Sequence, residues 1–379
     1  MAARELTESQ REWLRVRAYL QENRQALSEL AVARYPDVPK VGGSSLLSNQ
    51  AWLPDEPISL ESIELSWTPD HPRPGLFPAD ELTEHLRPIQ DGNRYPSYSA
   101  AMADLAAPAV FQNRTTYRLR SAHLGRRSRM DFEPGHYFDG IDVGEACAHE
   151  LAAHTLGLIE ATPLRDAIGD PCRPSRRPTN VAIAALTLRH DRTTGDATFP
   201  LHWRDPAKVG HAGGTYMVIP VGVFQSTGDD PRLQLKDLSL FDCLVREYRE
   251  EMLGLPESAG DIAGSGALWP RVEAATQRGD IGFHVLGMGT DPLTFATDLL
   301  VAGTFEADLY DELFLDVVTT NSEGRLVEAT CGGAANGRFA FTNDEIEQVF
   351  QTGRLQAAGA ATLRLSSHRR DHLLASVPR

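Results

Sequence analysis

The sequence predicts an α/β protein, with a sandwich of strands and helices in its C-terminal part and an α+β region before it. Apolar residues recur at helical spacing from about Glu8 to Ala33, and a proline-rich connection follows. After residue 178, apolar strand patterns alternate with amphipathic helix patterns, which favours an α/β sandwich. We therefore divide the chain into an N-terminal region, residues 1–177, and a second domain, residues 178–379.

The composition is that of an ordinary globular protein and disfavours several kinds of partner. With 41% hydrophobic side chains, the 379 residues can bury a sizeable core without disulfides. The formal net charge of −15 makes nucleic acid an unexpected partner, because its phosphates would be repelled. The four cysteines show no C-x-x-C spacing, the first residues do not resemble a signal peptide, and no apolar run could span a bilayer. We expect a cytoplasmic protein without membrane contact.

The N-terminal region combines helices with the proline-rich connection. Its first helix ends before Tyr35-Pro36, because a residue before proline avoids the helical conformation. The residues expected on its buried face are Trp13, Val16, Leu20, Leu27 and Leu30. Apolar side chains in the connection predict burial rather than a disordered linker: Trp52, Leu60, Ile63, Leu65 and Trp67. A helix over 95–111, a strand over 115–119 and a helix over 142–158 are also predicted.

The second domain opens with a predicted hairpin and ends with two helices. Strand 181–188 is followed by a Thr-Gly turn and by a partner strand over 198–203. Further strands are predicted over 216–224, 283–286, 293–305 and 313–320. Helices are predicted over about 239–253, 343–350 and 355–375.

The helix over 239–253 carries the strongest functional signal. Asp237 or Ser239 can cap its start, and Gly254 ends it. Its expected buried face consists of Phe241, Leu244, Val245, Tyr248 and Met252. The opposite side carries Glu247, Glu250 and Glu251 at positions i, i+3 and i+4, and Arg246 can pair with Glu250.

Three carboxylates within about one helical turn repel one another unless a cation neutralises them. Oxygen ligands of this kind suit Mg²⁺ or Mn²⁺, which prefer to share their coordination shell with phosphates. The alternative interpretation is a solvated acidic face on an amphipathic helix, since Glu is a common surface residue of helices.

The spelling Arg-Glu-x-x-Glu-Glu at 246–251 resembles the core of the Nudix box, Gly-x5-Glu-x7-Arg-Glu-U-x-Glu-Glu-x-Gly-U, where U is apolar. The segment 219–222, Ile-Pro-Val-Gly, is similar to the strand that enters the loop before that helix. The resemblance covers residues 178–379 and is to large Nudix-like proteins with an additional N-terminal region. It implies an α/β/α sandwich with a mixed sheet.

The sequence departs from the family pattern in three places. Twenty-three residues separate Gly222 from Arg246, so the loop between them carries an insertion. No glutamate lies at the expected position upstream of the helix, where the nearby acids are Asp229, Asp230 and Asp237. Two residues instead of one separate Glu251 from Gly254.

The resemblance implies a Mg²⁺- or Mn²⁺-dependent hydrolase of a nucleoside diphosphate linked to another group, or of a related small phosphorylated metabolite. Glu247, Glu250 and Glu251 would be the metal ligands, and Glu323 is a candidate base. Arg204, Arg246 and Gly222 are candidate ligand-binding residues, and a homodimer is a candidate assembly. Two alternatives remain: a Nudix-like binding or regulatory protein without turnover, and a Nudix scaffold that acts non-hydrolytically in a biosynthetic pathway.

Other clusters have less specific interpretations. His149 and His154 flank Glu150 but are five positions apart, which places them on different faces of a helix and disfavours a zinc protease. We expect His149 and Glu150 to make interdomain or surface contacts. The arginines of 126–129 and of 176–177 either bind an anion or are solvated. Cys243 is expected to be packed rather than nucleophilic.

Overall fold

The structure is a computed structural model that describes residues 5–69, 80–108, 111–204, 214–255, 268–315, 324–327, 338–352 and 354–377. It confirms the predicted α/β class: helices and strands alternate along the chain, and the main sheet contains both parallel and antiparallel pairs. Among the described residues, no helix is long and apolar enough to cross a membrane.

The main sheet is built around two long parallel strands. β7 (Val181–His190) pairs with β13 (Thr297–Glu306) in parallel over their whole length, and β13 pairs with β12 (Ile281–Thr290) in antiparallel orientation. Shorter strands extend this sheet: β1 (Ile58–Ser59) beside β12, and β11 (Val221–Val223) and β8 (Ala197–Phe199) beside β7, with β15 (Phe339–Ala340) beside β8. The predicted hairpin of strand 181–188 with its successor is therefore confirmed.

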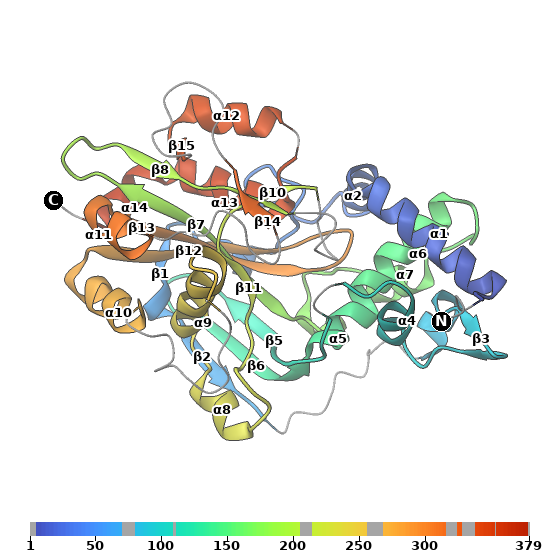
Figure 1. The fold of residues 1–379 in the computed structure, drawn as a ribbon. Helices are drawn as coiled ribbons and strands as arrows, with labels where there is room; N and C mark the ends of the chain where they lie inside the picture. The colour runs from blue at the N-terminus through green and yellow to red at the C-terminus, as the bar shows by residue number, and fades with distance from the viewer. Residues whose placement is uncertain are drawn as a thin grey trace.

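Helices cover both faces of this sheet (Figure 1). On one face lie α9 (Leu240–Glu247), α10 (Leu268–Arg278) and α11 (Ala307–Leu313), whose apolar residues pack with Ile183 and Leu299. On the other lie α12 (Asn343–Gln351), α13 (Ala357–His368) and α14 (Arg370–Ala375), packed with Ala184 and Leu300. Neighbouring strand residues point to opposite faces, so each strand contributes to both clusters.

The N-terminal region forms a second body of helices with its own small sheet. Its helices are α1 (Glu8–Glu22), α2 (Arg24–Ala33), α3 (Asp80–Thr83), α4 (Tyr98–Leu105), α5 (Tyr137–Gly140), α6 (Ala146–Thr155) and α7 (Pro163–Ile168). A π-turn over Ile141–Glu145 precedes α6. Its strands are β2 (Glu64–Trp67), β5 (Thr115–His123) and β6 (Arg129–His136), which form a three-stranded sheet, and the pair β3 (Ile89–Gln90) and β4 (Asn93–Arg94).

Remaining elements connect these parts. A second small sheet contains β9 (His202–Arg204), β10 (Tyr216–Met217) and β14 (Gly324–Leu326), and α8 (Pro231–Lys236) lies in the loop before α9. Short 3₁₀ turns span Gln50–Trp52, Leu60–Ser62, Glu84–Leu86 and Pro174–Arg176.

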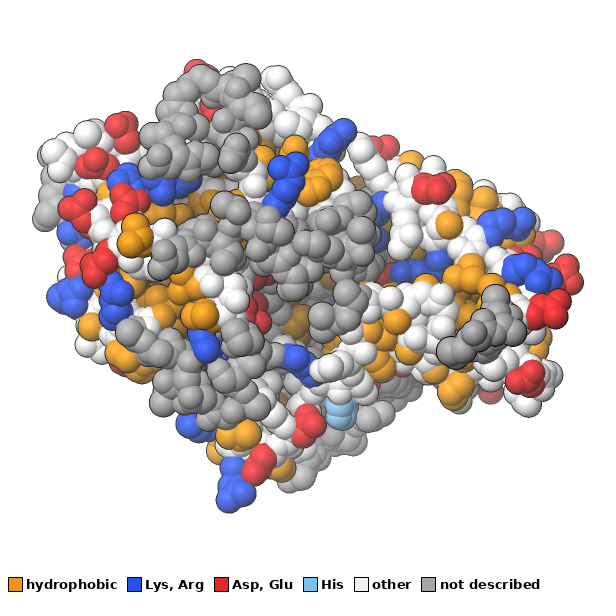
Figure 2. All heavy atoms as spheres, viewed as in Figure 1, with side chains coloured by type: hydrophobic (Ala, Val, Ile, Leu, Met, Phe, Trp, Pro, Cys, Tyr) orange, Lys and Arg blue, Asp and Glu red, His pale blue; other side chains and the backbone are white. Residues whose placement is uncertain are grey.

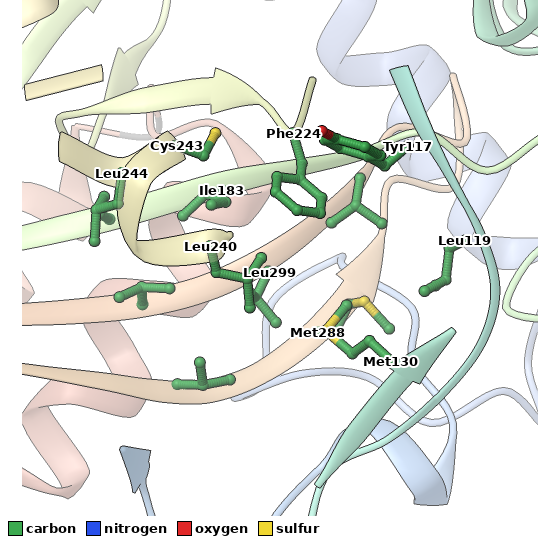
Figure 3. Packing of buried hydrophobic residues seen from close by; sticks show 14 of the residues in the cluster. Tyr117, Leu119, Met130, Ile183, Phe224, Leu240, Cys243, Leu244, Met288 and Leu299 are labelled. Atoms are coloured by element: carbon green, nitrogen blue, oxygen red, sulfur yellow. The ribbon is translucent and has the colours of Figure 1, made fainter. Parts of the chain in front are cut away.

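The N-terminal region is joined to the main sheet by backbone pairing and by aromatic packing. Ile58 of β1 lies opposite Val285 of β12, and the Tyr117 N–H donates to the Phe224 carbonyl at 3.2 Å. The Tyr117 and Phe224 rings lie 4.5 Å apart, beside a core in which Leu240 and Leu244 of α9 face Ile183 (Figure 3). One hydrophobic cluster therefore contains residues from both sides of position 177.

Several predicted elements differ in extent from the observed ones. The first helix is interrupted at Asn23, and Leu30, expected to be buried, is 47% exposed. The helix predicted over 95–111 is limited to α4, and the strand predicted over 198–203 splits because its second half joins β10. Leu313 ends a helix rather than starting a strand, and residues 316–320 of that prediction lie outside the described residues.

Candidate functional site

The carboxylate-bearing helix begins at Ser239, whose hydroxyl accepts a hydrogen bond from the Asp242 N–H at 3.1 Å. Leu244, Val245, Tyr248 and Met252 are buried as predicted, whereas Phe241 is half-buried against Trp269 and Phe283. Cys243 is fully buried, and burial raises the pKa of its thiol to about 12. The prediction that Cys243 is packed is confirmed.

The helix widens into a π-turn over Tyr248–Met252. A π-turn closes i→i+5 hydrogen bonds and therefore holds one residue more than an α-helical turn. It accommodates the additional residue before Gly254, which ends the helix with a φ of 65°. The Tyr248 hydroxyl lies 2.9 Å from the Thr187 hydroxyl, which donates to the Ile219 carbonyl at 2.6 Å, so the helix is fixed to the sheet at this turn.

Two of the three predicted carboxylates meet strand β11. The Glu251 side chain is buried, and its Oε2 accepts a hydrogen bond from the Val221 N–H at 3.1 Å. The Glu247 carboxyl carbon lies 1.8 Å from the position that a Cβ on Gly222 would occupy. Gly222 is therefore needed here because any larger residue would displace the Glu247 carboxylate.

The sequence also predicted Glu250 as a metal ligand and Glu323 as a base. Glu250 is half-buried and has contacts of its own. Glu323 lies outside the described residues. Among the residues that the structure describes, no three His, Cys, Asp or Glu side chains are grouped closely enough to hold a metal ion.

Arg246 does not pair with Glu250 as expected. Its Nη2 donates to the Gln225 carbonyl at 2.7 Å, and its Nη1 lies 4.0 Å from Asp237 Oδ2. The Asp237 carboxylate is 2% exposed and also accepts from the Thr227 N–H at 2.9 Å. Arg246 therefore holds the inserted loop against the helix instead of facing a ligand.

Asp237 is a buried acid of the inserted loop, upstream of the helix. It lies nine positions before Arg246, whereas the pattern places its glutamate eight positions before the arginine. It does not cap the helix, whose N-cap is Ser239; its Oδ2 instead accepts hydrogen bonds from the Thr227 and Ser226 hydroxyls within the loop.

Arg204 ends strand β9 and is half-buried, with Nη1 4.0 Å from the Met217 sulfur. The positive charge of Arg204 acts on Asp298, where it opposes the rise in the pKa of the carboxyl that burial causes. Arg204 therefore lies near the other face of the sheet from Glu247, the face covered by α13.

His149 and Glu150 are interior residues, which corrects the expectation of surface or interdomain contacts. His149 stacks on Trp13 and lies 3.3 Å from the Tyr98 hydroxyl, and burial lowers its pKa to about 3. Glu150 is fully buried and accepts hydrogen bonds from the N–H groups of Leu164 and Arg165, at the start of α7. These contacts are structural.

The two arginine clusters differ in their surroundings. Arg176 and Arg177 donate to backbone carbonyls, and Arg177 is buried, so Arg177 is not available to a ligand. Arg126 and Arg127 are exposed and line an open hollow at the tip of the β5–β6 hairpin, beside Glu64. Figure 2 shows charges of both signs interspersed along the side that carries α10 and α11, so on this face the acidic residues do not form one patch.

One acidic residue of the sheet interior was not singled out from the sequence. Asp298 of β13 is 3% exposed, and burial raises the pKa of its carboxyl to about 7. Its signal in the sequence is weak but visible: it is a single charge within the apolar run Leu293–Phe305. Buried polar groups are normally hydrogen-bonded, so a lone aspartate in a central strand calls for an explanation.

No protein family model matches this chain, and the search of curated proteins found no significant match.

Proposed function

We propose that this protein is a Nudix-like hydrolase that uses a divalent cation to act on the phosphoanhydride of a small phosphorylated metabolite. The observation that carries this proposal is the convergence of Glu247 and Glu251 on residues 221–222 of β11. Helix α9 and the π-turn that follows it support the proposal, because they direct the carboxylates of Glu247 and Glu251 to the same strand.

The donor set fits Mg²⁺ or Mn²⁺. Both ions prefer oxygen ligands and keep part of their shell for water and substrate phosphates, so two or three carboxylates suffice. Glu247 and Glu251 would hold the ion as a pair, with water and substrate phosphates completing its shell, because no three such side chains are grouped among the described residues. When bound, the cation supplies positive charge that neutralises the phosphate oxygens.

This chain's own residues supply the positioning. Ser239 fixes the helix start, Tyr248 fixes its turn to the sheet, and Arg246 with Asp237 fixes the preceding loop. Held at three points, the carboxylates require little rearrangement when a charged ligand arrives.

A binding or regulatory protein without turnover is the second candidate. Glu251 already accepts the Val221 N–H, and Asp237 is engaged by Arg246, so both acids have structural roles. The third interpretation, non-hydrolytic chemistry on the same scaffold, shares these contacts.

Glu247→Gln and Glu251→Gln are expected to abolish stabilisation by Mn²⁺ with nucleotide sugars. Each glutamine keeps the shape and the acceptor oxygen, so the Val221 contact survives while the charge is lost. In thermal unfolding experiments, the free energy of unfolding of the wild type should rise when Mn²⁺ and ligand are added. The expected increase is about 2.7 kcal/mol at a hundredfold excess of ligand over Kd. Phosphate release measured in parallel separates hydrolysis from binding alone.

Glu273→Gln, on the neighbouring helix α10, is the matched control and should respond to Mn²⁺ like the wild type. Stabilisation that is independent of Mn²⁺ and unchanged in the two variants would support the binding protein. Stabilisation without phosphate release across the panel would rule out hydrolysis of these compounds.

Gly222→Ala is expected to weaken the response to Mn²⁺ while leaving the stability of the fold nearly unchanged. The added Cβ meets the flexible end of Glu247 rather than backbone, so the side chain moves and the free energy of unfolding changes by less than about 1 kcal/mol. The midpoint of the Mn²⁺ response should rise at least tenfold. An unchanged Mn²⁺ midpoint would show that the observed position of Glu247 is unimportant for the cation.

A further inference from the structure

The Tyr248 hydroxyl is a polar group inside an aromatic cluster. Tyr248 is 1% exposed, and its ring centroid lies 5.4 Å from that of Phe305 and 5.6 Å from that of Phe314. The Nudix pattern that 246–251 resembles places an apolar residue at this position, and a phenylalanine would fill the cluster without a polar atom. A buried hydroxyl costs free energy unless it is hydrogen-bonded, so packing alone does not account for a tyrosine here.

The partner of this hydroxyl is Thr187 of β7, which is itself fully buried. The two hydroxyl oxygens lie 2.9 Å apart, and Thr187 donates its proton to the Ile219 carbonyl at 2.6 Å. A hydroxyl has one proton to donate, so Tyr248 must be the donor to Thr187. The result is a directed chain from the tyrosine through the threonine to a backbone carbonyl. In such a chain each hydrogen bond strengthens the next.

Gly303 leaves space for this chain. It lies opposite Thr187 on the adjacent strand β13. A Cβ at Gly303 would lie 2.7 Å from the Tyr248 hydroxyl oxygen and 2.9 Å from a ring carbon of Phe283. A side chain at this position would push the tyrosine away from Thr187, so the sheet has room for the hydroxyl because position 303 is a glycine.

The chain links the two parts of the molecule that form the proposed cation site. Tyr248 begins the π-turn that carries Glu251. Ile219 lies two residues before Val221, whose N–H donates to Glu251. Thr187 therefore holds the helix turn through its oxygen and the entry to β11 through its proton. A displacement of either part relative to β7 would break the chain.

We propose that Thr187 is a positioning residue of the cation site, whose hydroxyl fixes the carboxylates of Glu247 and Glu251 relative to β11. Thr187 is enclosed in the core and acts through Tyr248 and Ile219. The consequence for Mn²⁺ rests on the proposed function. The positioning itself is a property of the fold and can be measured without a cation.

Two substitutions at position 187 separate the role of the hydroxyl from that of the methyl group. Thr187→Val keeps the shape and removes the hydroxyl, whereas Thr187→Ser keeps the hydroxyl and removes the methyl group. Without divalent cation, hydrogen exchange of peptides that contain Val221, measured by mass spectrometry, should be about tenfold faster in Thr187→Val than in the wild type. Thr187→Ser should exchange at nearly the wild-type rate.

The response to Mn²⁺ with a nucleotide sugar is the second measurement. Its midpoint should rise about tenfold in Thr187→Val and less than about twofold in Thr187→Ser, because only the first loses the hydrogen-bond chain. Tyr248→Phe removes the same link from its other end and should match Thr187→Val in both measurements. The double variant should be no worse than either single variant, since both changes break one chain.

Thr362→Val is the matched control. Thr362 is fully buried on α13, on the other face of the sheet, and its hydroxyl donates to the Ala358 carbonyl at 2.8 Å. This variant also loses a buried hydroxyl, but it should leave the exchange around Val221 and the Mn²⁺ midpoint unchanged. Circular dichroism confirms that the variants are folded, and if Thr187→Val does not fold, Tyr248→Phe carries the test.

A role in packing alone would reverse the order of the two variants at position 187. Greater disturbance in Thr187→Ser than in Thr187→Val would therefore overturn the inference, as would unchanged exchange around Val221 in Thr187→Val. A wild type without a Mn²⁺ response would contradict the proposed function, while the exchange experiment would still decide whether Thr187 positions the two parts. If the wild type responds to Mn²⁺, an unchanged midpoint in Thr187→Val would show that this positioning does not serve the cation.

Discussion

Asp298→Asn is expected to stabilise the protein at neutral pH, by about 4 kcal/mol. The pKa of the Asp298 carboxyl rises from 3.8 in an exposed chain to about 7 in the fold, mainly because of burial. Below pH 4 both states carry the proton. Between pH 4 and 7 the unfolded chain releases it while the folded chain retains it, so stability falls as the pH rises, by about 1.4 kcal/mol per pH unit, and levels off above 7.

Asparagine removes this pH dependence. The stability difference between variant and wild type should therefore grow from about 2 kcal/mol at pH 5 to about 4 kcal/mol above pH 7. Urea unfolding at a series of pH values measures it. Asp191→Asn is the control, because backbone hydrogen bonds lower the pKa of this exposed carboxyl, and its variant should be less stable at neutral pH. A pH-independent difference at position 298 would show that Asp298 is ionised with an unrecognised partner.

Gly144→Ala is expected to destabilise the protein by about 3 kcal/mol. A Cβ on Gly144, in the π-turn before α6, would lie 2.0 Å from the Thr294 carbonyl oxygen. That carbonyl cannot move freely, because Asp291 accepts the N–H groups of Leu293 and Thr294 and fixes the turn. Overpacking against rigid backbone commonly costs 1–3 kcal/mol and sometimes more.

Chemical unfolding of Gly144→Ala and Gly228→Ala provides the comparison. At Gly228 the nearest atom to an added Cβ is the end of the Leu233 side chain, which can rotate away. We expect a change below about 1 kcal/mol there. Similar losses in the two variants would mean that the contact between α6 and the β12–β13 turn is not tight in solution.

Much of the fold could be predicted from the sequence, because local patterns determine it. Helix α12 begins at Asn343, where the sequence predicted a helix to start, and β7 follows its apolar run from Val181. The predictions failed where contacts between residues distant in the sequence determine the extent of an element. The strand expected over 198–203 divides because Trp203 pairs with Tyr216, a contact that no local pattern contains.

The candidate site was only partly predictable for the same reason. The spacing of Glu247, Glu250 and Glu251 assumes a regular helix, and the π-turn alters the direction of the later side chains. The partner of Arg246 lies in a loop that local helical spacing does not reach. Asp298 matters through its burial between neighbouring strands, which depends on the assembled sheet.

The contact between Glu251 and Val221 also affects how this protein meets other chains. An edge strand of a sheet can pair with a strand of another chain, because its outward backbone amides and carbonyls are unpaired. At β11 the exposed stretch is only three residues long, and a carboxylate occupies its Val221 amide. The same glutamate that faces the proposed cation therefore discourages self-association through this edge.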